Sequence, residues 1–338
     1  MTTVNAGQSA AIYLLASKKD SSTQELDDVS KKTADYLSSS TSHNGDTVTL
    51  SAAATAALAA TSSTTTDSQA AYYEHFFPTR SGTSASFGEN VLDPAATTIS
   101  TGLRASGIAR AARASMDAEY TSMEVDGKSF NYDSANGTDW YTLMSGLDRT
   151  ALAAVSSNQG GLFSTKEQGM AQYIMLQQEQ LAAGNYSGPM GLESKFISAP
   201  VSGEGYSIDS SNAAVSSRSN VTYASTASSE NLSTYLDKAG SYEKSTIGWA
   251  FSRASAQTAY EEEMGAANQP VDSKYVSGLT IVGMLSGLMK NAQKTHVSND
   301  PSVLNITDLF NETWATEHEA AIQAALTATR RELGLSQG

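Results

Sequence analysis

Two short segments near the carboxyl end of the sequence carry residue types that hydrolases use. The segment 334–338 reads Gly-Leu-Ser-Gln-Gly and matches the Gly-x-Ser-x-Gly motif of a nucleophilic serine. That chemistry needs a strand before the serine and a helix after it, whereas a helical pattern precedes Ser336. The segment 318–322 begins like the zinc motif His-Glu-x-x-His, but Ile322 stands where the second histidine ligand belongs. Neither segment therefore predicts a catalytic site.

The segment 131–139, Asn-Tyr-Asp-Ser-Ala-Asn-Gly-Thr-Asp, resembles a calcium-binding loop in composition. When Gly137 is aligned with the invariant glycine of such a loop, Tyr132 takes the place of the first aspartate ligand. The alternation of oxygen ligands is therefore broken. This pattern favours a solvated turn over an ion site.

The remaining candidate patterns are incomplete as well. Ser241 and Lys244 have Ser-x-x-Lys spacing without a companion Lys-Thr-Gly motif, and the segment 203–205 lacks the third glycine of a dinucleotide-binding turn. The glutamates 261–263 point in three directions around a helix, and His75 lies among aromatic residues, which favours a half-buried anchor over a ligand. We therefore predict no catalytic, cofactor-binding or metal-binding residue, and we do not expect an enzyme.

The composition of the chain limits its possible partners. It has no cysteine, and hence no disulfide, thiolate metal site or cysteine nucleophile. Its 338 residues carry a formal net charge of -14, which repels phosphate backbones and anionic lipids, so we expect no binding of nucleic acid. The longest apolar stretch, 275–289, is shorter than the about 20 residues that span a bilayer. We therefore expect no membrane insertion.

The elements that would position any site are predicted to be mainly α-helices, elongated or bundled. Helical periodicity with capping signals predicts helices at 22–37, 165–183 and 308–333, and others at 228–239 and 241–264. Asp93 followed by Pro94 predicts the start of another long helix. One small β-hairpin is predicted at 123–130, because Asp126-Gly127 separates two alternating segments.

Three regions follow from this pattern. We predict an N-terminal helical region at 1–184, an irregular Gly/Ser-rich insertion at 185–227, and a C-terminal helical region at 228–338. In the C-terminal region, Gly283 and Gly287 are four residues apart, a spacing that lets another backbone approach closely. That approach fits either a helix crossing within the chain or a contact between subunits.

One segment of the sequence resembles a known family. The residues 100–104, Ser-Thr-Gly-Leu-Arg, are similar to the Ser-Gly-Leu-Arg stretch near the start of flagellins. The absence of cysteine, the Ser/Thr/Ala-rich composition and the helical ends also resemble flagellins. In flagellins the stretch closely follows the first terminal helix, whereas here it lies about 100 residues into the chain. The resemblance implies an exported bacterial filament protein, and it carries over no functional residue.

These observations lead to one expectation with two alternatives. We expect a structural subunit of an exported bacterial filament, sheath or surface assembly, which self-associates through its terminal helices. No positive charge precedes the short apolar run near its start, as it would in a classical signal peptide. We therefore expect export to the cell surface or medium by a signal-peptide-independent route. The alternatives are a phage virion or tail component, and an enzyme or small-molecule binder whose site is assembled from residues distant in sequence.

The terminal helices give a first test of self-association. Replacement Trp314→Ala, or deletion of residues 1–20, should abolish polymers and leave a folded core, because each buried apolar side chain contributes about 1.5–3 kcal/mol. Electron microscopy after negative staining, together with circular dichroism, would measure both effects. Normal polymers in both variants would place the contact elsewhere.

Overall fold

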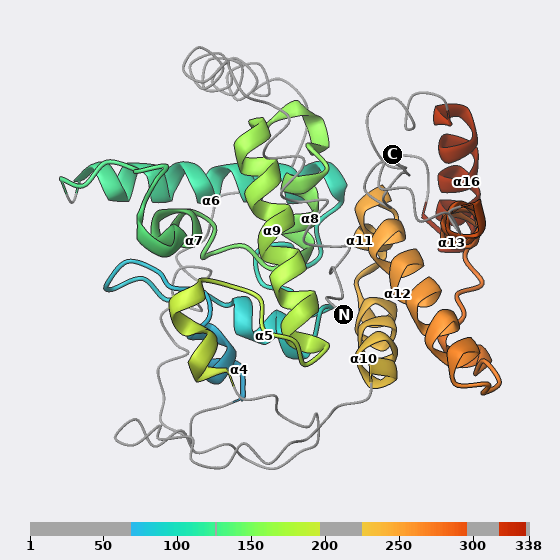
Figure 1. Cartoon of the computed structure of the whole chain (residues 1–338). Helices are drawn as coiled ribbons and strands as arrows, with labels where there is room; N and C mark the ends of the chain where they lie inside the picture. The colour runs from blue at the N-terminus through green and yellow to red at the C-terminus, as the bar shows by residue number, and fades with distance from the viewer. Residues whose placement is uncertain (1–68, 126, 197–224, 296–317, 336–338) are drawn as a thin grey trace, which may run out of the picture.

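A computed structural model describes residues 69–125, 127–196, 225–295 and 318–335 (Figure 1). The prediction of a mainly α protein is confirmed, since the described part of the chain contains helices and no strand. A first lobe contains α4 (Gln69–Glu74), α5 (Phe87–Leu92), α6 (Ala105–Val125), η2 (Ala135–Gly137), α7 (Thr138–Leu143), α8 (Arg149–Ser156), η3 (Gln159–Gly161), α9 (Thr165–Ala182) and η4 (Met190–Lys195). A second lobe contains α10 (Ser225–Lys238), α11 (Ser241–Lys244), α12 (Ile247–Ala266), η5 (Ser273–Tyr275), α13 (Thr280–Thr295) and α16 (Glu319–Glu332).

Each lobe has its own hydrophobic core. The first core is centred on aromatic side chains, with Phe77 packed against Phe87 and Tyr141 at ring-centroid distances of 5.2 and 5.8 Å. The second core is more aliphatic and surrounds Trp249, whose indole N–H donates to the Leu236 carbonyl at 2.8 Å. The two clusters are separate but meet at their edges, where Tyr242 of α11 packs against the first core and Ala182 of α9 packs against both.

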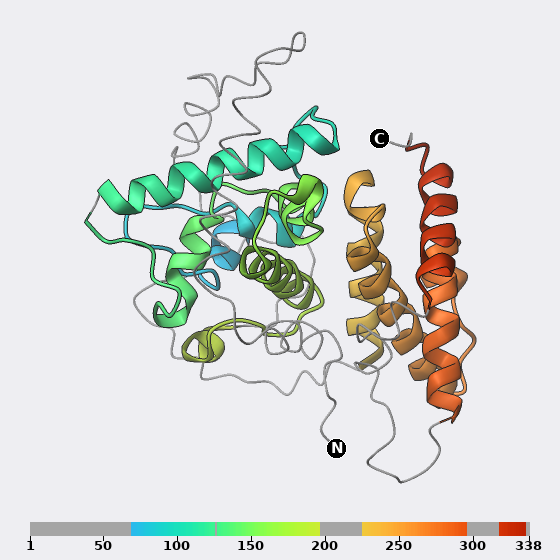
Figure 2. The ribbon, with the colours of Figure 1, turned by 90° about the horizontal axis from the view of Figure 1, so that it is seen from above.

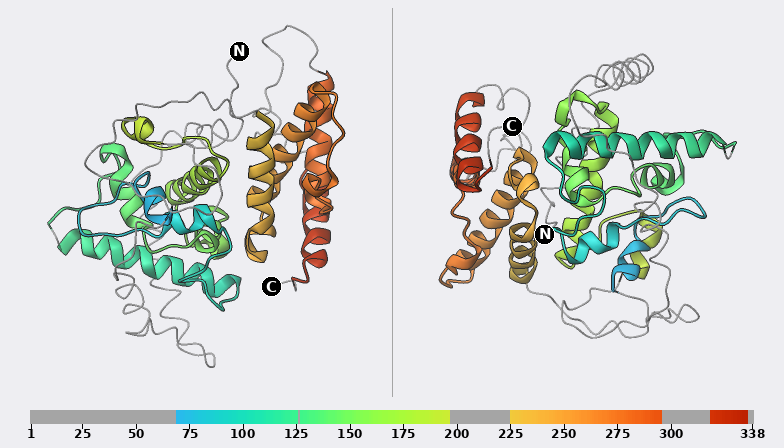
Figure 3. Two further views of the ribbon diagram at one scale, coloured as in Figure 1. Left: turned by 90° about the horizontal axis from the view of Figure 1, so that it is seen from below. Right: turned by 180° about the vertical axis from the view of Figure 1, so that it is seen from behind.

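The helices from α8 onward pack largely in sequence. Helix α8 packs on α9, α9 on α10, α10 on α12, α12 on α13 and α13 on α16. The views from above and below agree that α16 lies at the outer edge of the second lobe, away from the first (Figures 2 and 3). Helix α16 corresponds to the helix predicted at 308–333. It is observed over Glu319–Glu332, and its predicted start at 308 lies outside the described residues.

The hairpin predicted at 123–130 is wrong, because residues 123–125 form the last turn of α6. Gly127 has a φ of 70°, and its N–H donates to the Glu124 carbonyl at 3.0 Å. The N–H of Lys128 donates to the Met123 carbonyl at 3.2 Å. These two bonds are those of a Schellman helix ending, in which glycine adopts the left-handed conformation. An Asp-Gly pair supplies such an ending as readily as a hairpin turn.

The long helix predicted to begin at Asp93-Pro94 begins later, at Ala105. The reason is a distant carboxylate that binds the intervening loop. One oxygen of Asp148 accepts the N–H groups of Thr98 and Ser100 at 2.7 and 3.0 Å, and the Ser100 hydroxyl at 2.8 Å. These donors are therefore not available to a helix. The flagellin-like segment 100–104 lies in this loop.

Other predicted elements agree in part. Helix α9 begins at the predicted capping box, in which Ser164 and Glu167 exchange hydrogen bonds. The helix predicted at 241–264 is divided into α11 and α12, because Thr246 caps a new helix and accepts the Trp249 N–H at 3.3 Å. The helix at 22–37 and most of the insertion at 185–227 lie outside the described residues, and the region boundaries stay predictions. Residues 185–196 contribute Tyr186, Leu192 and Phe196 to the rim of the first core.

A fully buried arginine joins the two lobes. Arg149 of α8 donates to both carboxylate oxygens of Glu243 in α11, at distances of 2.7 to 3.0 Å, and to Glu179 of α9 at 2.7 Å. Its remaining donor reaches the Met175 carbonyl and the Gln178 side chain. Both Arg149 and Glu243 have 0% of their surface exposed. The guanidinium also lies 5.0 Å from the ring centroid of Tyr235 in α10.

Neutral hydrogen bonds complete this junction. The Tyr235 hydroxyl donates to the Asn90 carbonyl at 2.6 Å, and the Asn90 side chain accepts the Arg149 N–H at 3.0 Å. We call Asn90, Arg149, Glu179, Tyr235 and Glu243 the lobe junction. It is polar although it is buried, so its hydrogen-bond geometry fixes how one lobe sits on the other.

Among the residues that the structure describes, no helix combines the length and the apolarity needed to cross a bilayer.

The lobe junction predicts a pH dependence of stability. Burial raises the pKa of Glu243 above its ordinary 4.5, against the opposing effect of Arg149. A raised carboxyl pKa contributes stability that is complete at low pH and is lost as the pH rises through the folded-state pKa. In urea unfolding, the free energy of unfolding of the parent protein should therefore fall as the pH rises above 4.5. The fall should be smaller in Glu243→Gln, which has no carboxyl group to ionise. The same pH profile in Glu243→Gln and the parent protein would contradict this assignment.

A second substitution tests the cation of the junction. Arg149→Met leaves two buried carboxylates without their cation and should lower the free energy of unfolding by about 3–5 kcal/mol.

Candidate functional site

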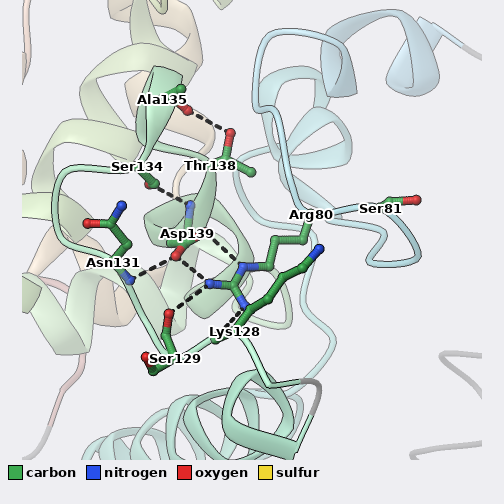
Figure 4. Close-up of a pocket in the computed structure, with 9 residues that line it drawn as sticks. All are labelled: Arg80, Ser81, Lys128, Ser129, Asn131, Ser134, Ala135, Thr138 and Asp139. Atoms are coloured by element: carbon green, nitrogen blue, oxygen red, sulfur yellow. Dashed lines mark hydrogen bonds and ion pairs between the residues drawn. The ribbon is translucent and has the colours of Figure 1, made fainter.

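A polar hollow of about 690 Å³ opens on the first lobe between the loop after α4 and the loop before α7 (Figure 4). Its lining combines one acid, two basic residues, hydroxyls and an amide: Arg80, Ser81, Lys128, Ser129, Asn131, Ser134, Ala135, Thr138 and Asp139. A concave site with converging polar groups is what the small-molecule alternative requires. The hollow is therefore a candidate site in the described part of the chain.

The ion pair between Arg80 and Asp139 is the centre of the hollow. The Arg80 Nε–H donates to one Asp139 oxygen at 2.8 Å, and an Nη2–H donates to the other. The same guanidinium donates to the carbonyls of Lys128 and Ser129 at 2.6 and 3.3 Å. Figure 4 shows the Arg80 side chain lying across the hollow between Asp139 and these carbonyls. One arginine thus connects three segments of the first lobe.

The segment 131–139 forms one wall of the hollow, and two of its possible ligand side chains, Asn131 and Asp139, already accept hydrogen bonds. The Asp139 carboxylate also accepts the Asn131 N–H at 2.8 Å, and the Asn131 side chain accepts the Asp133 N–H at 3.0 Å. Asn136 and Gly137 turn the chain with positive φ values of 56° and 70°. The calcium-like loop therefore uses Asn131 and Asp139 to stabilise its own turn, and Asp139 also binds the Arg80 guanidinium.

Aromatic residues pack within and against this loop. Phe130 packs edge to face on Tyr132 and Trp140 at ring-centroid distances of 4.9 and 4.8 Å. The Trp140 indole N–H donates to the Tyr132 carbonyl at 3.1 Å, and the Lys166 ammonium lies 4.5 Å from the Tyr132 ring centroid. The wall of the hollow is consequently fixed by packing as well as by hydrogen bonds.

The electrostatics of the hollow favour an ionised pair. The hydrogen bond from Arg80 lowers the pKa of Asp139 below its ordinary 3.8, while burial opposes that effect and the Asn131 N–H supports it. Asp139 is therefore a carboxylate at neutral pH and does not act as a general acid there. The groups left to face a ligand are the Lys128 ammonium and the exposed hydroxyls of Ser81 and Ser129. Such a set can bind a polar or anionic molecule.

The structure does not bring the other sequence motifs together with this hollow. Ser241 is exposed at the start of α11, and Lys244 donates to the Asp237 carbonyl at 2.6 Å, so the two do not form a nucleophile and base. His318 precedes α16, and Ile322 at the second ligand position is buried in the second core. Ser336 and the segment 203–205 lie outside the described residues.

Two further predictions can be compared with the structure. His75 was expected to be half-buried, but it is exposed, and its Nδ1 makes a 2.8 Å hydrogen bond with the Ala71 carbonyl. The glutamates 261–263 do diverge, since Glu261 pairs with Lys290 of α13 and Glu263 accepts the Ser229 hydroxyl. In the described part of the chain no three His, Cys, Asp or Glu residues gather as metal ligands would. The absence of metal chemistry stays a prediction.

Sequence reasoning missed the arginines. Arg80, Arg149 and Arg253 each bind a carboxylate that lies 16 to 94 residues away, as Arg253 does with Asp237 at 2.8 Å. For Arg149 the available signal was an arginine at the start of an otherwise apolar helical pattern, the α8 sequence Arg-Thr-Ala-Leu-Ala-Ala-Val-Ser. That signal indicates a buried charge but does not name its partner.

Comparison with known proteins gives no relative: no family model, no curated protein and no solved structure matches the chain.

The ion pair in the hollow can be tested by substitution. Asp139→Asn should lower stability by about 1.5–3 kcal/mol, the range for a hydrogen bond to a charged group. The stabilising effect of the carboxylate should be present above its unfolded pKa and lost as the pH falls through the depressed folded pKa. Urea unfolding between pH 2 and 7 would measure both effects. Asp133→Asn, on the exposed side of the same loop, is the matched control, and equal losses in the two variants would contradict the role of the pair.

Proposed function

We propose that this protein is a structural subunit of an exported bacterial filament, sheath or surface assembly, and that it self-associates through its terminal helices. The cysteine-free, Ser/Thr/Ala-rich and acidic sequence supports this class of protein. The observation that carries the proposal is the outward face of α16, at the edge of the second lobe (Figure 1).

Helix α16 has two faces of different character. Ile322, Ala325, Leu326 and Thr329 are buried against the second lobe. On the opposite side, Ala320, Ala324, Thr327 and Arg331 are exposed and recur at helical spacing. Three of these four side chains are small, so a neighbouring helix can approach closely along this face.

The charges of α16 favour a second copy of the same helix as the partner. Glu319 lies in its first turn, and Arg330 and Arg331 lie in its last turn. When two such helices pack antiparallel, the acidic end of each meets the basic end of the other. This is the self-complementarity that a two-fold contact requires. Exposed ion pairs contribute little energy, about 0–1 kcal/mol, so they set the orientation while the packed face supplies the affinity.

The outward face of α13 supports a second contact. A Cβ atom added at Gly283 or Gly287 would meet no described atom within 4 Å. Each glycine inside a helix costs about 0.5–1 kcal/mol relative to alanine, and no helix crossing among the described residues offsets that cost. Of the two explanations for the glycine spacing, a contact between subunits is the one that this geometry favours.

A second candidate function is the binding of a polar small molecule in the hollow at Arg80 and Asp139. Its support is the concave shape and the free Lys128 and Ser81 groups. Light scattering separates the two candidates, since a protein that stays monomeric at all concentrations favours the binder. A phage virion or tail component would share the self-association and would be distinguished by finding the polymer in virions.

The proposed function predicts that one residue on the α16 face controls assembly. Ala324→Arg places a long charged side chain in the middle of the contact and should raise the concentration needed for assembly at least tenfold. Light scattering and negative-stain microscopy would measure this effect. Ala118→Arg, at an exposed alanine of α6 in the first lobe, is the matched control and should assemble normally. Unchanged assembly of Ala324→Arg, with the same circular dichroism as the control, would remove α16 from the contact.

A further inference from the structure

The lobe junction has the properties of an interface between two molecules. The buried residues of the two cores form separate clusters, and between them lie the buried polar groups of the lobe junction, with Tyr242 and Ala182 as apolar contacts at the edges. Arg149 and Glu243 meet with a geometry that few other surfaces could satisfy, because both charges are fully desolvated. Each lobe therefore presents a specific docking face for the other lobe, and nothing in that recognition requires both lobes to belong to one chain.

The connection between the lobes is long enough to reach another copy. Residues 197–224 join the first lobe to α10. A chain of this length can extend over roughly 90 Å at about 3.3 Å per residue. A compact chain of 338 residues has a radius of gyration of about 20 Å, so this reach exceeds the diameter of one such subunit.

We propose that the second lobe of one copy docks on the first lobe of a neighbouring copy, through the same junction that closes the single chain. The partner is thus a second copy of this protein. The inference extends the proposed structural function. It rests on that function because an assembly brings copies of the protein to the high local concentration that exchange requires. Exchange replaces each junction by an identical one, so its energetic cost is small.

Protein concentration decides which form is present. A covalent connection gives the two lobes of one chain an effective concentration that is about millimolar for short linkers. Dilute protein is therefore closed within one chain, and exchange becomes competitive when the local concentration of subunits in an assembly approaches that range. The exchange is also directional, because the second lobe of each copy binds the first lobe of the next.

The absence of cysteine allows a direct test. A Cβ atom added at Gly240 would lie 3.3 Å from the Thr150 Oγ1 across the junction. The sulfur of a cysteine at 150 can take the place of that oxygen, so cysteines at the two positions are close enough for a disulfide. The φ of Gly240 is -63°, a value that cysteine adopts without strain. We would make Thr150→Cys and Gly240→Cys as separate full-length variants, mix them in equal amounts, assemble and oxidise them.

The expected result is a disulfide-linked heterodimer on a non-reducing gel, at least several-fold more abundant than the dimer from either variant alone. The same mixture kept dilute should give no heterodimer. The control is the chain with both substitutions, which should form an internal disulfide when dilute. If the control forms its disulfide and the assembled mixture does not, lobe exchange is overturned. If the control forms none, the junction geometry and the proposal with it are overturned.

Microscopy of the same samples separates this inference from the proposed function. Polymers without the heterodimer leave the structural function in place and remove lobe exchange. A heterodimer without polymers supports exchange between copies and removes the filament, sheath or surface assembly.

Discussion

The arrangement of the helices depends on the burial of one charge, the guanidinium of Arg149. An arginine cannot lose its proton in a protein, so its donors must all find acceptors when it is fully buried. Glu179 and Glu243, with the Met175 carbonyl and the Gln178 side chain, provide them. Each acceptor fixes the position of α9 or α11 relative to α8. A buried ion pair adds little net stability compared with apolar residues of the same volume, and its contribution here is to exclude other arrangements.

The composition explains why such buried ion pairs are needed to fix the helix packing. Many buried positions are alanine, as at residues 151, 153 and 154 of α8, and alanine lets helices approach closely but gives them few features that set a register. Buried arginines supply that information elsewhere too. Arg113 of α6 binds Glu167 in the capping box of α9 at 2.8 Å, and Arg253 of α12 binds Asp237 of α10. A chain poor in large apolar side chains thus uses directional polar contacts to select one packing.

What could be predicted from the sequence follows from the range of the interactions involved. Helix α9 was predictable because its capping box and periodicity lie within a few residues. The ending of α6 was not, because Asp-Gly serves both a Schellman ending and a hairpin turn. The late start of α6 depends on Asp148, some 48 residues beyond Ser100, and the α11 residue Glu243 binds an arginine 94 residues earlier. In the candidate site, the segment 131–139 could be recognised from its composition, but its partner Arg80 could not.

Two of the proposed contacts between copies, the pairing of α16 helices and lobe exchange, have different symmetry, and this limits what they can build. An antiparallel contact between two α16 helices is isologous, so by itself it closes at two copies. Lobe exchange is heterologous, because a docking face on one lobe meets a different face on the next copy, and such a contact continues without limit unless it closes into a ring. A chain of exchanged copies still displays α16 at the outer edge of every second lobe. Pairing of those helices then joins neighbouring chains, so the combination favours a double filament, sheath or surface layer over a single-stranded polymer.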